Sequence, residues 1–118
     1  MPGLIDTELG QIILSEDVIA TVAGYAAGDN FGIVGMSGKT AKDALIQFVG
    51  GTNHKRGVKV TPIDNGSAVD IDMYVTVAYG VSISAVGKNT VDNVRYRVEE
   101  MTGLKVNHVT VHVEDIRV

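Results

Sequence analysis

The fold of this chain is decided by residues 81–113, which read VSISAVGKNTVDNVRYRVEEMTGLKVNHVTVHV. In the first two thirds of this stretch, apolar side chains recur every three or four residues, the spacing of one buried helix face. Ser82 or Ser84 can accept hydrogen bonds from the first free N–H groups, and Gly103 suits the left-handed residue that ends a helix. We therefore predict a helix over Ser82–Thr102. Its buried stripe comprises Ile83, Val86, Gly87, Thr90, Val91, Val94, Val98 and Met101.

Alternating apolar and polar residues flank this helix on both sides. Apolar or aromatic residues occupy every second position from Val69 to Tyr79, and again from Val109 to Val113. A period of two is typical of strands that bury one face. The second half of the chain is therefore predicted to be a strand, a long helix and a second strand, which together form a scaffold.

The first half of the chain gives shorter elements. Ser15 is a helix cap followed by two acidic residues in the first turn, and Val18, Ile19, Val22, Ala23 and Ala26 form the buried face of that helix. Glycines end both early helices. The predicted elements are a strand over Gly10–Leu14, a helix from Ser15 to Gly28, a strand over Phe31–Met36, and a helix over Ala41–Val49 that ends at Gly50-Gly51.

The strongest turn signal is Asn65-Gly66, which lies between two apolar runs. Both residues tolerate the positive φ angles of a type I′ turn, so a β-hairpin is predicted there. Because the strands alternate, one sheet face should be apolar and the other polar. We predict one α/β domain over residues 1–118, of the two-layer α+β kind. The predicted sheet is mixed, and the helices lie mainly on one of its faces. The order of strands and helices along the chain is β-α-β-α-β-β-α-β.

Composition and charge argue against several kinds of function. The formal net charge is −4, which gives no electrostatic reason to expect nucleic acid or anionic lipid as a direct ligand. The chain has no cysteine, so disulfides and thiolate chemistry are absent. No apolar run approaches the roughly 20 residues that span a bilayer. These features favour a cytoplasmic protein without direct membrane insertion, and no cofactor is expected.

A glycine-rich segment, residues 32–40, resembles the end of a nucleotide-binding loop at Gly38-Lys39-Thr40. The complete motif requires a glycine five positions before Gly38, where this chain has Ile33. A turn that leads into a helix is the favoured interpretation. A small-ligand or nucleic-acid-binding module that uses this segment and the basic loop 54–56 remains the alternative function.

Histidines and carboxylates gather on the predicted polar face without forming a recognisable catalytic or metal site. His108 and His112 are four residues apart on one strand, about 13 Å, which is too far for one metal ion. Asp70 and Asp72 are spaced like a glycosidase pair, but the chain has no Trp and only four Tyr to stack on sugars. What remains is a candidate partner interface, for which we expect Tyr74 as the anchor. It comprises Tyr74, Thr76, His108, Thr110 and His112.

Several segments carry a resemblance to a known family. They read GQIILSEDVIATVAGYAA, FGIVGM, GGTNHKRGVKV, VDIDMYVTVAYGVSISAV and VRYRVEEMTGLKVNHVTVHVEDIRV. In this order they resemble the alkaline shock protein family, small cell-envelope stress response proteins of Gram-positive bacteria. The most specific pieces are Tyr79-Gly80-Val81 and the run from Glu100 to Leu104. Arg56 replaces the lysine that the family carries there.

The resemblance implies a non-enzymatic protein of the cytoplasm that acts through protein partners. Some members of the family are held near the membrane by a separate membrane-embedded protein, and some self-assemble. It therefore implies a scaffold for envelope homeostasis, with a membrane-embedded anchor protein and a homo-oligomer as expected partners. It gives no catalytic, metal-binding or cofactor-binding residue to carry over.

Overall fold

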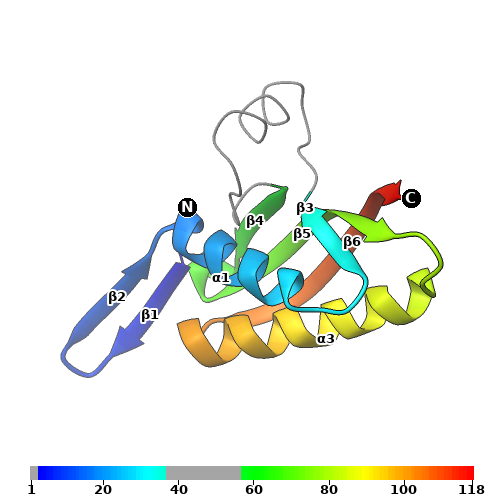
Figure 1. Cartoon of the computed structure of the whole chain (residues 1–118). Coiled ribbons are helices and arrows are strands. Elements are labelled where there is room, and N and C mark those ends of the chain that lie inside the picture. Colours follow the sequence, from blue (N-terminus) through cyan, green and yellow to red (C-terminus); the bar gives the residue numbers. More distant parts are fainter. Residues whose placement is uncertain (1–2, 37–56) are drawn as a thin grey trace.

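The computed structural model describes residues 3–36 and 57–118, shown in Figure 1. Within these ranges the chain forms six strands, two α-helices and one short 3-10 turn. In chain order the elements are β1 (Gly3–Thr7), β2 (Gly10–Leu14), α1 (Glu16–Gly28), β3 (Ile33–Met36), β4 (Val58–Ile63), η1 (Asp64–Gly66), β5 (Ala68–Ala78), α3 (Ile83–Thr102) and β6 (Lys105–Arg117). The α+β class is confirmed. The predicted helix over Ala41–Val49 and the basic loop 54–56 lie outside the described residues.

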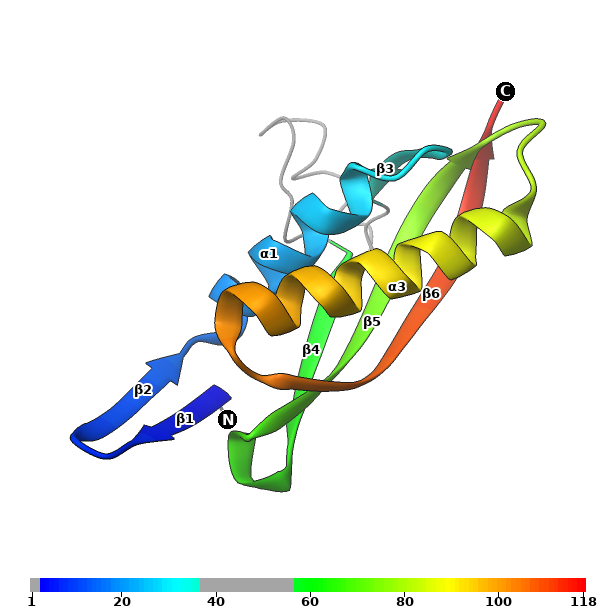
Figure 2. The same ribbon diagram turned by 90° about the horizontal axis from the view of Figure 1, so that it is seen from below.

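Strand β5 is the centre of the main sheet. β6 pairs with it in parallel along its whole length, from Ala68 to Ala78. β4 pairs antiparallel with the first half of β5, and β3 pairs antiparallel with its last residues. Because a strand has only two edges, β3 and β4 share the edge opposite β6, as Figure 2 shows. The sheet is therefore mixed, as predicted.

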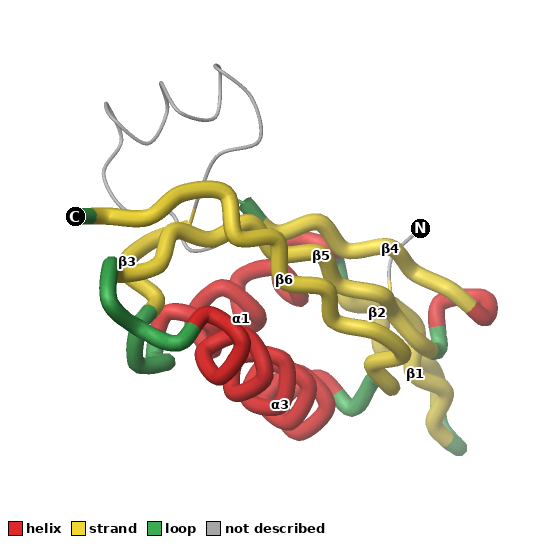
Figure 3. The backbone as a smooth tube through the Cα atoms, turned by 90° about the vertical axis from the view of Figure 1, so that its right-hand side faces the viewer, coloured by secondary structure: helices red, strands yellow, loops and turns green. Residues whose placement is uncertain are grey.

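Both described helices pack on the same face of this sheet (Figure 3). The pattern of β5 accounts for this one-sided packing. Its residues alternate between fully buried and half-buried positions along the strand, so only one face of the sheet is apolar. Val69, Ile71, Met73, Val75 and Val77 face the helices and are at most 1% exposed. Together with the inner sides of α1 and α3 they form the hydrophobic core. The opposite face of the sheet carries the polar residues of β5.

Helix α3 begins and ends where the sequence predicts. The Ser82 hydroxyl accepts a hydrogen bond from the Ala85 N–H at 3.4 Å, and Gly103 ends the helix with a φ of 78°. Its buried stripe runs in steps of four residues through Val86, Thr90, Val94, Val98 and Thr102. The predicted stripe was wrong at both ends: Ile83 is 44% and Met101 is 65% exposed. Thr102 replaces Met101, because steps of four continue the same stripe.

Two threonines inside this apolar stripe bury their hydroxyls without leaving them unbonded. The Thr90 hydroxyl donates to the Val86 carbonyl at 2.7 Å, and the Thr102 hydroxyl donates to the Val98 carbonyl at 2.6 Å. Burying a hydroxyl costs little free energy when it is hydrogen-bonded in this way. The methyl group of each threonine packs like a methyl group of valine.

Helix α1 packs through small side chains, which let it lie close to α3. Its buried residues are Ile19, Ala20, Ala23, Gly24, Ala26 and Ala27. Val18, predicted to be buried, is 46% exposed, because the alanine-rich side of the helix faces the core. Asn30 follows the helix and is itself buried. Its amide donates to the Ala26 and Ala27 carbonyls, and its side-chain oxygen accepts from the Asn93 amide of α3 at 2.8 Å.

The hairpin at Asn65-Gly66 is confirmed, but its turn type was predicted wrongly. β4 and β5 pair from Val58 with Met73 to Ile63 with Ala68, which leaves four residues in the loop. Asp64, Asn65 and Gly66 have positive φ angles of 51°, 59° and 90°. The Ser67 hydroxyl donates to the Asp64 carbonyl at 2.8 Å and closes the loop. The loop therefore contains Asp64 and Ser67 in addition to Asn65 and Gly66, and the Ser67 backbone N–H also donates to the Asp64 carbonyl.

A second small sheet was not predicted. Gly10–Leu14 is a strand, as expected, but it pairs with β1 rather than with the main sheet. This hairpin projects from the body of the molecule, with a fully exposed Leu9 in its turn (Figures 1 and 2). Gly3 lies at its base, where an added Cβ would stand 2.5 Å from Leu104 Cδ1. The predicted element order therefore lacked one strand.

Candidate interaction face

The sheet face opposite α1 and α3 is the candidate site, and we call it the polar face. On β5 it carries the half-buried side chains of Asp70, Asp72, Tyr74 and Thr76. Parallel pairing places His108 beside Asp70, Thr110 beside Asp72, and His112 beside Tyr74. All five residues predicted as an interface therefore lie on one face of two neighbouring strands. β4 adds Lys59 beside Asp72 and Thr61 beside Asp70.

Tyr74, His112 and Asp72 form the centre of this face. The Tyr74 and His112 rings are stacked, with centroids 4.4 Å apart and planes 8° from parallel. His112 Nε2 lies 3.1 Å from Asp72 Oδ1, within hydrogen-bonding distance. The Tyr74 backbone N–H donates to the Gly57 carbonyl at 2.7 Å. The tyrosine ring is consequently held in one orientation by a neighbour that is itself bonded to a carboxylate.

At the other end of the polar face, Asp70 accepts hydrogen bonds from β6. Its Oδ1 accepts hydrogen bonds from the His108 backbone N–H at 3.1 Å and from the Asn107 amide at 3.2 Å. The His108 ring is largely exposed, with Nδ1 3.6 Å from the same carboxylate oxygen. Asn107 is the extra residue of a bulge, because Val69 pairs with Val106 and Asp70 already pairs with His108. The bulge turns the Asn107 side chain toward Asp70.

A second bulge decides which acidic residue of β6 lies beside Thr76. Simple alternation places Glu114 on the same face as His112, whereas the structure pairs Val75 with Val113 and Thr76 with Asp115. Glu114 is the extra residue, so Asp115 rather than Glu114 stands beside Thr76. Bulges of this kind shift every later side chain by one position, and the sequence pattern does not reveal them.

The chemistry of the polar face is that of a preformed hydrogen-bonding surface. Its two histidines belong to separate aspartate pairs, and within residues 3–36 and 57–118 no three His, Asp or Glu residues are close enough to hold a metal ion. The sequence analysis missed Lys59 and Thr61, although they alternate with Val58 and Val60 and could have been placed on this face by that pattern.

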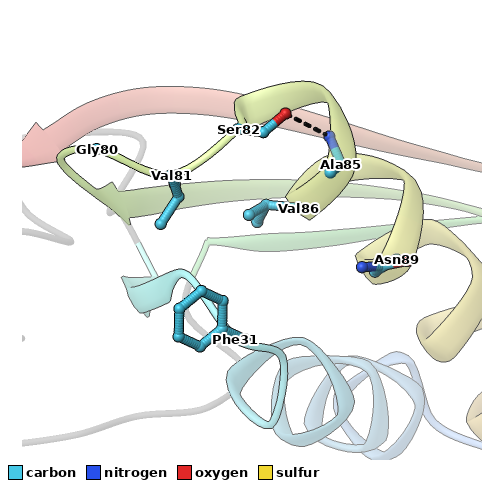
Figure 4. Close-up of a pocket in the computed structure, with 7 residues that line it drawn as sticks. All are labelled: Phe31, Gly80, Val81, Ser82, Ala85, Val86 and Asn89. Atoms are coloured by element: carbon cyan, nitrogen blue, oxygen red, sulfur yellow. Dashed lines mark hydrogen bonds between the residues drawn. The ribbon is translucent and has the colours of Figure 1, made fainter.

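A surface pocket lies at the end of the sheet where β5 turns into α3. Its volume is about 390 Å³, and Figure 4 shows Phe31 on one side with Val81 and Val86 facing it. The other lining residues are Gly80, Ser82, Ala85 and Asn89. Phe31 is 88% exposed at the pocket. The pocket is mainly apolar and was not predicted, because its wall combines Phe31, which precedes β3, with the distant loop before α3 and the first turns of α3.

Gly32, the first glycine of the segment that resembles a nucleotide-binding loop, has a packing role. Its φ is 94°, and an added Cβ would stand 2.6 Å from Val86 Cγ2 of α3. The glycine therefore allows the start of β3 to approach the helix closely. The rest of that segment, from residue 37 onward, lies outside the described residues, as does the basic loop 54–56.

Over the described residues, these features define a two-layer α+β protein with a mixed sheet, two helices on one face and a polar surface on the other. The profile of the alkaline shock protein 23 family, described as having a cell envelope-related function, matches residues 5–118. The chain therefore belongs to this family, as the sequence analysis predicted.

Relatives cover nearly the whole chain. It is 44% identical over 113 residues to the uncharacterized protein YloU of Bacillus subtilis (strain 168), a match that spans 95% of this chain and 92% of that protein. It is 42% identical over 115 residues to the uncharacterized protein Spy1614 of Streptococcus pyogenes serotype M6, spanning 97% and 93%. A second Bacillus subtilis protein, YqhY, is 37% identical over 112 residues, spanning 95% and 81%. No solved structure matches.

None of the described helices is both long and apolar enough to cross a membrane.

Proposed function

We propose that this chain is a non-enzymatic interaction protein of the cell envelope, which binds a protein partner through the polar face and also associates with itself. The family description supports the connection with the envelope. We place the protein in the cytoplasm, where binding to a membrane-embedded partner brings it to the membrane. The family resemblance supports this proposed location.

The observation that carries the proposal is the stacked and bonded group formed by Tyr74, His112 and Asp72. A partner gains most from an aromatic side chain that is already held in its binding orientation, because little rotational freedom is then lost. Tyrosine offers a large apolar area together with a hydroxyl that stays hydrogen-bonded at a wet interface. The carboxylates and histidines around it can exchange hydrogen bonds with a polar partner.

Two substitutions on the polar face should weaken partner binding. Tyr74→Ala removes the anchor, and an interface tyrosine of this kind contributes about 2 kcal/mol, or roughly a 30-fold change in Kd. Thr76→Arg should be more severe, since it adds both bulk and charge beside the anchor. The measurement is affinity capture from membrane and soluble fractions of the native host, followed by the Kd of the identified partner for each variant.

The matched control is Tyr96→Ala, which removes an exposed tyrosine from α3, on the opposite side of the molecule. This variant should bind like the wild type. Unchanged far-ultraviolet circular dichroism would show that the Tyr74 and Thr76 variants remain folded. Wild-type partner affinity in both folded variants would contradict the proposal and would place the interface on another surface.

A further inference from the structure

The outer edge of β6 is the longest strand edge in the described structure. β6 extends over 13 residues, roughly 40 Å, and forms one side of the sheet (Figure 2). One edge of it pairs with β5, and none of the described strands pairs with the other. Such an edge presents unpaired backbone N–H and C=O groups that can pair with another strand.

Both ends of this edge are occupied by other groups. Near the start, Glu99 Oε2 accepts from the Val106 N–H at 3.0 Å, and the Arg95 guanidinium donates to the Asn107 carbonyl at 3.2 Å. Near the other end, a bulge at Glu114 interrupts the ladder. Between them lies His108–Val113, which contains no proline, glycine, lysine, arginine or acidic residue. The devices that normally prevent edge pairing are therefore confined to the ends.

The side chains of β6 are arranged symmetrically about Val111. The residues that lie beside buried β5 positions, and so share the helix-facing side of the sheet, are Val106, Val109, Val111, Val113 and Ile116. Val109 and Val113 are each two residues from Val111, and Val106 and Ile116 are each five residues from it. The two bulges produce this symmetry, because without them positions 106 and 116 would face the other side.

Two antiparallel copies of β6 can therefore pair with every apolar residue opposite an apolar residue. Val109 meets Val113, Val106 meets Ile116, and Val111 meets its own counterpart. If the two-fold axis lay at Thr110 instead, Val106 would lie opposite Glu114, and the two side chains would not share a face of the sheet. The pattern of apolar residues therefore selects the register centred on Val111. In that register His108 also lies opposite Glu114. The like-charged pair, Lys105 with Arg117, lies at the solvated ends.

The helix-facing side of β6 is also less covered than that of β5. Met73, Val75 and Val77 are at most 1% exposed, whereas their neighbours Val111 and Val113 are only partly buried and Ile116 is 43% exposed. A second β6 would cover this apolar surface while bonding the free backbone groups. Both terms favour association, and the central segment His108–Val113 can pair without a change in the fold, because the bonds from Glu99 and Arg95 lie at the end of the edge.

We propose that two copies of this chain pair β6 with β6, antiparallel and about a two-fold axis at Val111, to form one continuous sheet. The partner at this surface is a second copy of the chain. The proposal deepens the self-association part of the proposed function, and it assigns that part to a strand edge that is separate from partner binding through Tyr74.

The decisive test uses single cysteines, since the chain has none of its own. In the proposed dimer the two Val111 residues are directly opposite, with Cα atoms about 4.5–5.5 Å apart, which is within the range of a disulfide. Val111→Cys should therefore form a covalent dimer with oxidised glutathione at least about tenfold faster than an unpaired control. Sedimentation velocity of the wild type should show a dimer at micromolar concentration.

The controls exploit the same register. Val109→Cys alone and Val113→Cys alone should not cross-link, because in each case the two thiols are about 13 Å apart. An equal mixture of these two variants should form the mixed disulfide, because residue 109 of one copy faces residue 113 of the other. A monomeric wild type, equal cross-linking of all three single variants, or a dimer without the Val111 disulfide would each overturn the proposal. None of these results would change the outcome of the Tyr74 experiment.

Discussion

Replacing Val94 with aspartate should unfold this protein. Val94 is fully buried at the middle of the α3 stripe, between Thr90 and Val98 and against the sheet. An unpaired carboxylate at such a position costs several kcal/mol, and the loss of the valine methyl groups adds to this cost. Proteins of this size are stabilised by roughly 5–15 kcal/mol in total. Circular dichroism during thermal and urea denaturation measures the effect.

The control for Val94→Asp is Asp92→Ala, only two residues away on the exposed side of α3. Its free energy of unfolding should lie within about 0.5 kcal/mol of the wild type, as for most surface substitutions. A thermal midpoint for Val94→Asp close to that of the wild type would refute the packing of α3 on the sheet described above.

Gly32→Ala should be the second most damaging substitution, at a cost of about 2–4 kcal/mol. Two effects combine at this position. The φ of 94° is strained for any residue with a Cβ, and that Cβ would stand 2.6 Å from Val86 Cγ2. The first effect costs about 1–2 kcal/mol, and overpacking a core typically costs about 1–3 kcal/mol. Urea denaturation measures their sum as a decrease in the free energy of unfolding.

The chain offers a control for each effect. Gly80 has the same φ of 94° with nothing within 4 Å of an added Cβ, so Gly80→Ala should show the backbone strain alone. Gly35 has open space and an ordinary φ, so Gly35→Ala should change the stability little. If Gly32→Ala and Gly80→Ala lost the same stability, the close contact between the start of β3 and Val86 would be disproved.

The elements that were predictable from sequence are those whose pattern is long and regular. β5 alternates over 11 residues and α3 repeats its apolar stripe over 20, so local periodicity was enough to define both. The hairpin between β4 and β5 was recognisable from Asn65-Gly66. β1 was missed because Gly3–Thr7 has no clear alternation, and because it is held by pairing with β2 rather than by burial of one face.

The sequence pattern predicted which residues lie on the polar face, but it did not predict the contacts between them. Tyr74 and His112 each have a clear place in an alternating strand, so their common face followed from the pattern. That they stack, and that His112 reaches Asp72, depends on the pairing register of strands almost 40 residues apart, which no local signal fixes. The bulges at Asn107 and Glu114 were invisible for the same reason.

The separate hairpin of β1 and β2 gives the molecule two levels of stability. In the described structure this small sheet is only two strands wide, and such a sheet has marginal stability of its own. Its backbone amides can open to solvent while the core stays closed, whereas β5 has a partner strand on both edges and opens only when the whole fold does. In native-state hydrogen exchange the projecting hairpin should therefore exchange well before β5. The two regions would report two different free energies from one molecule.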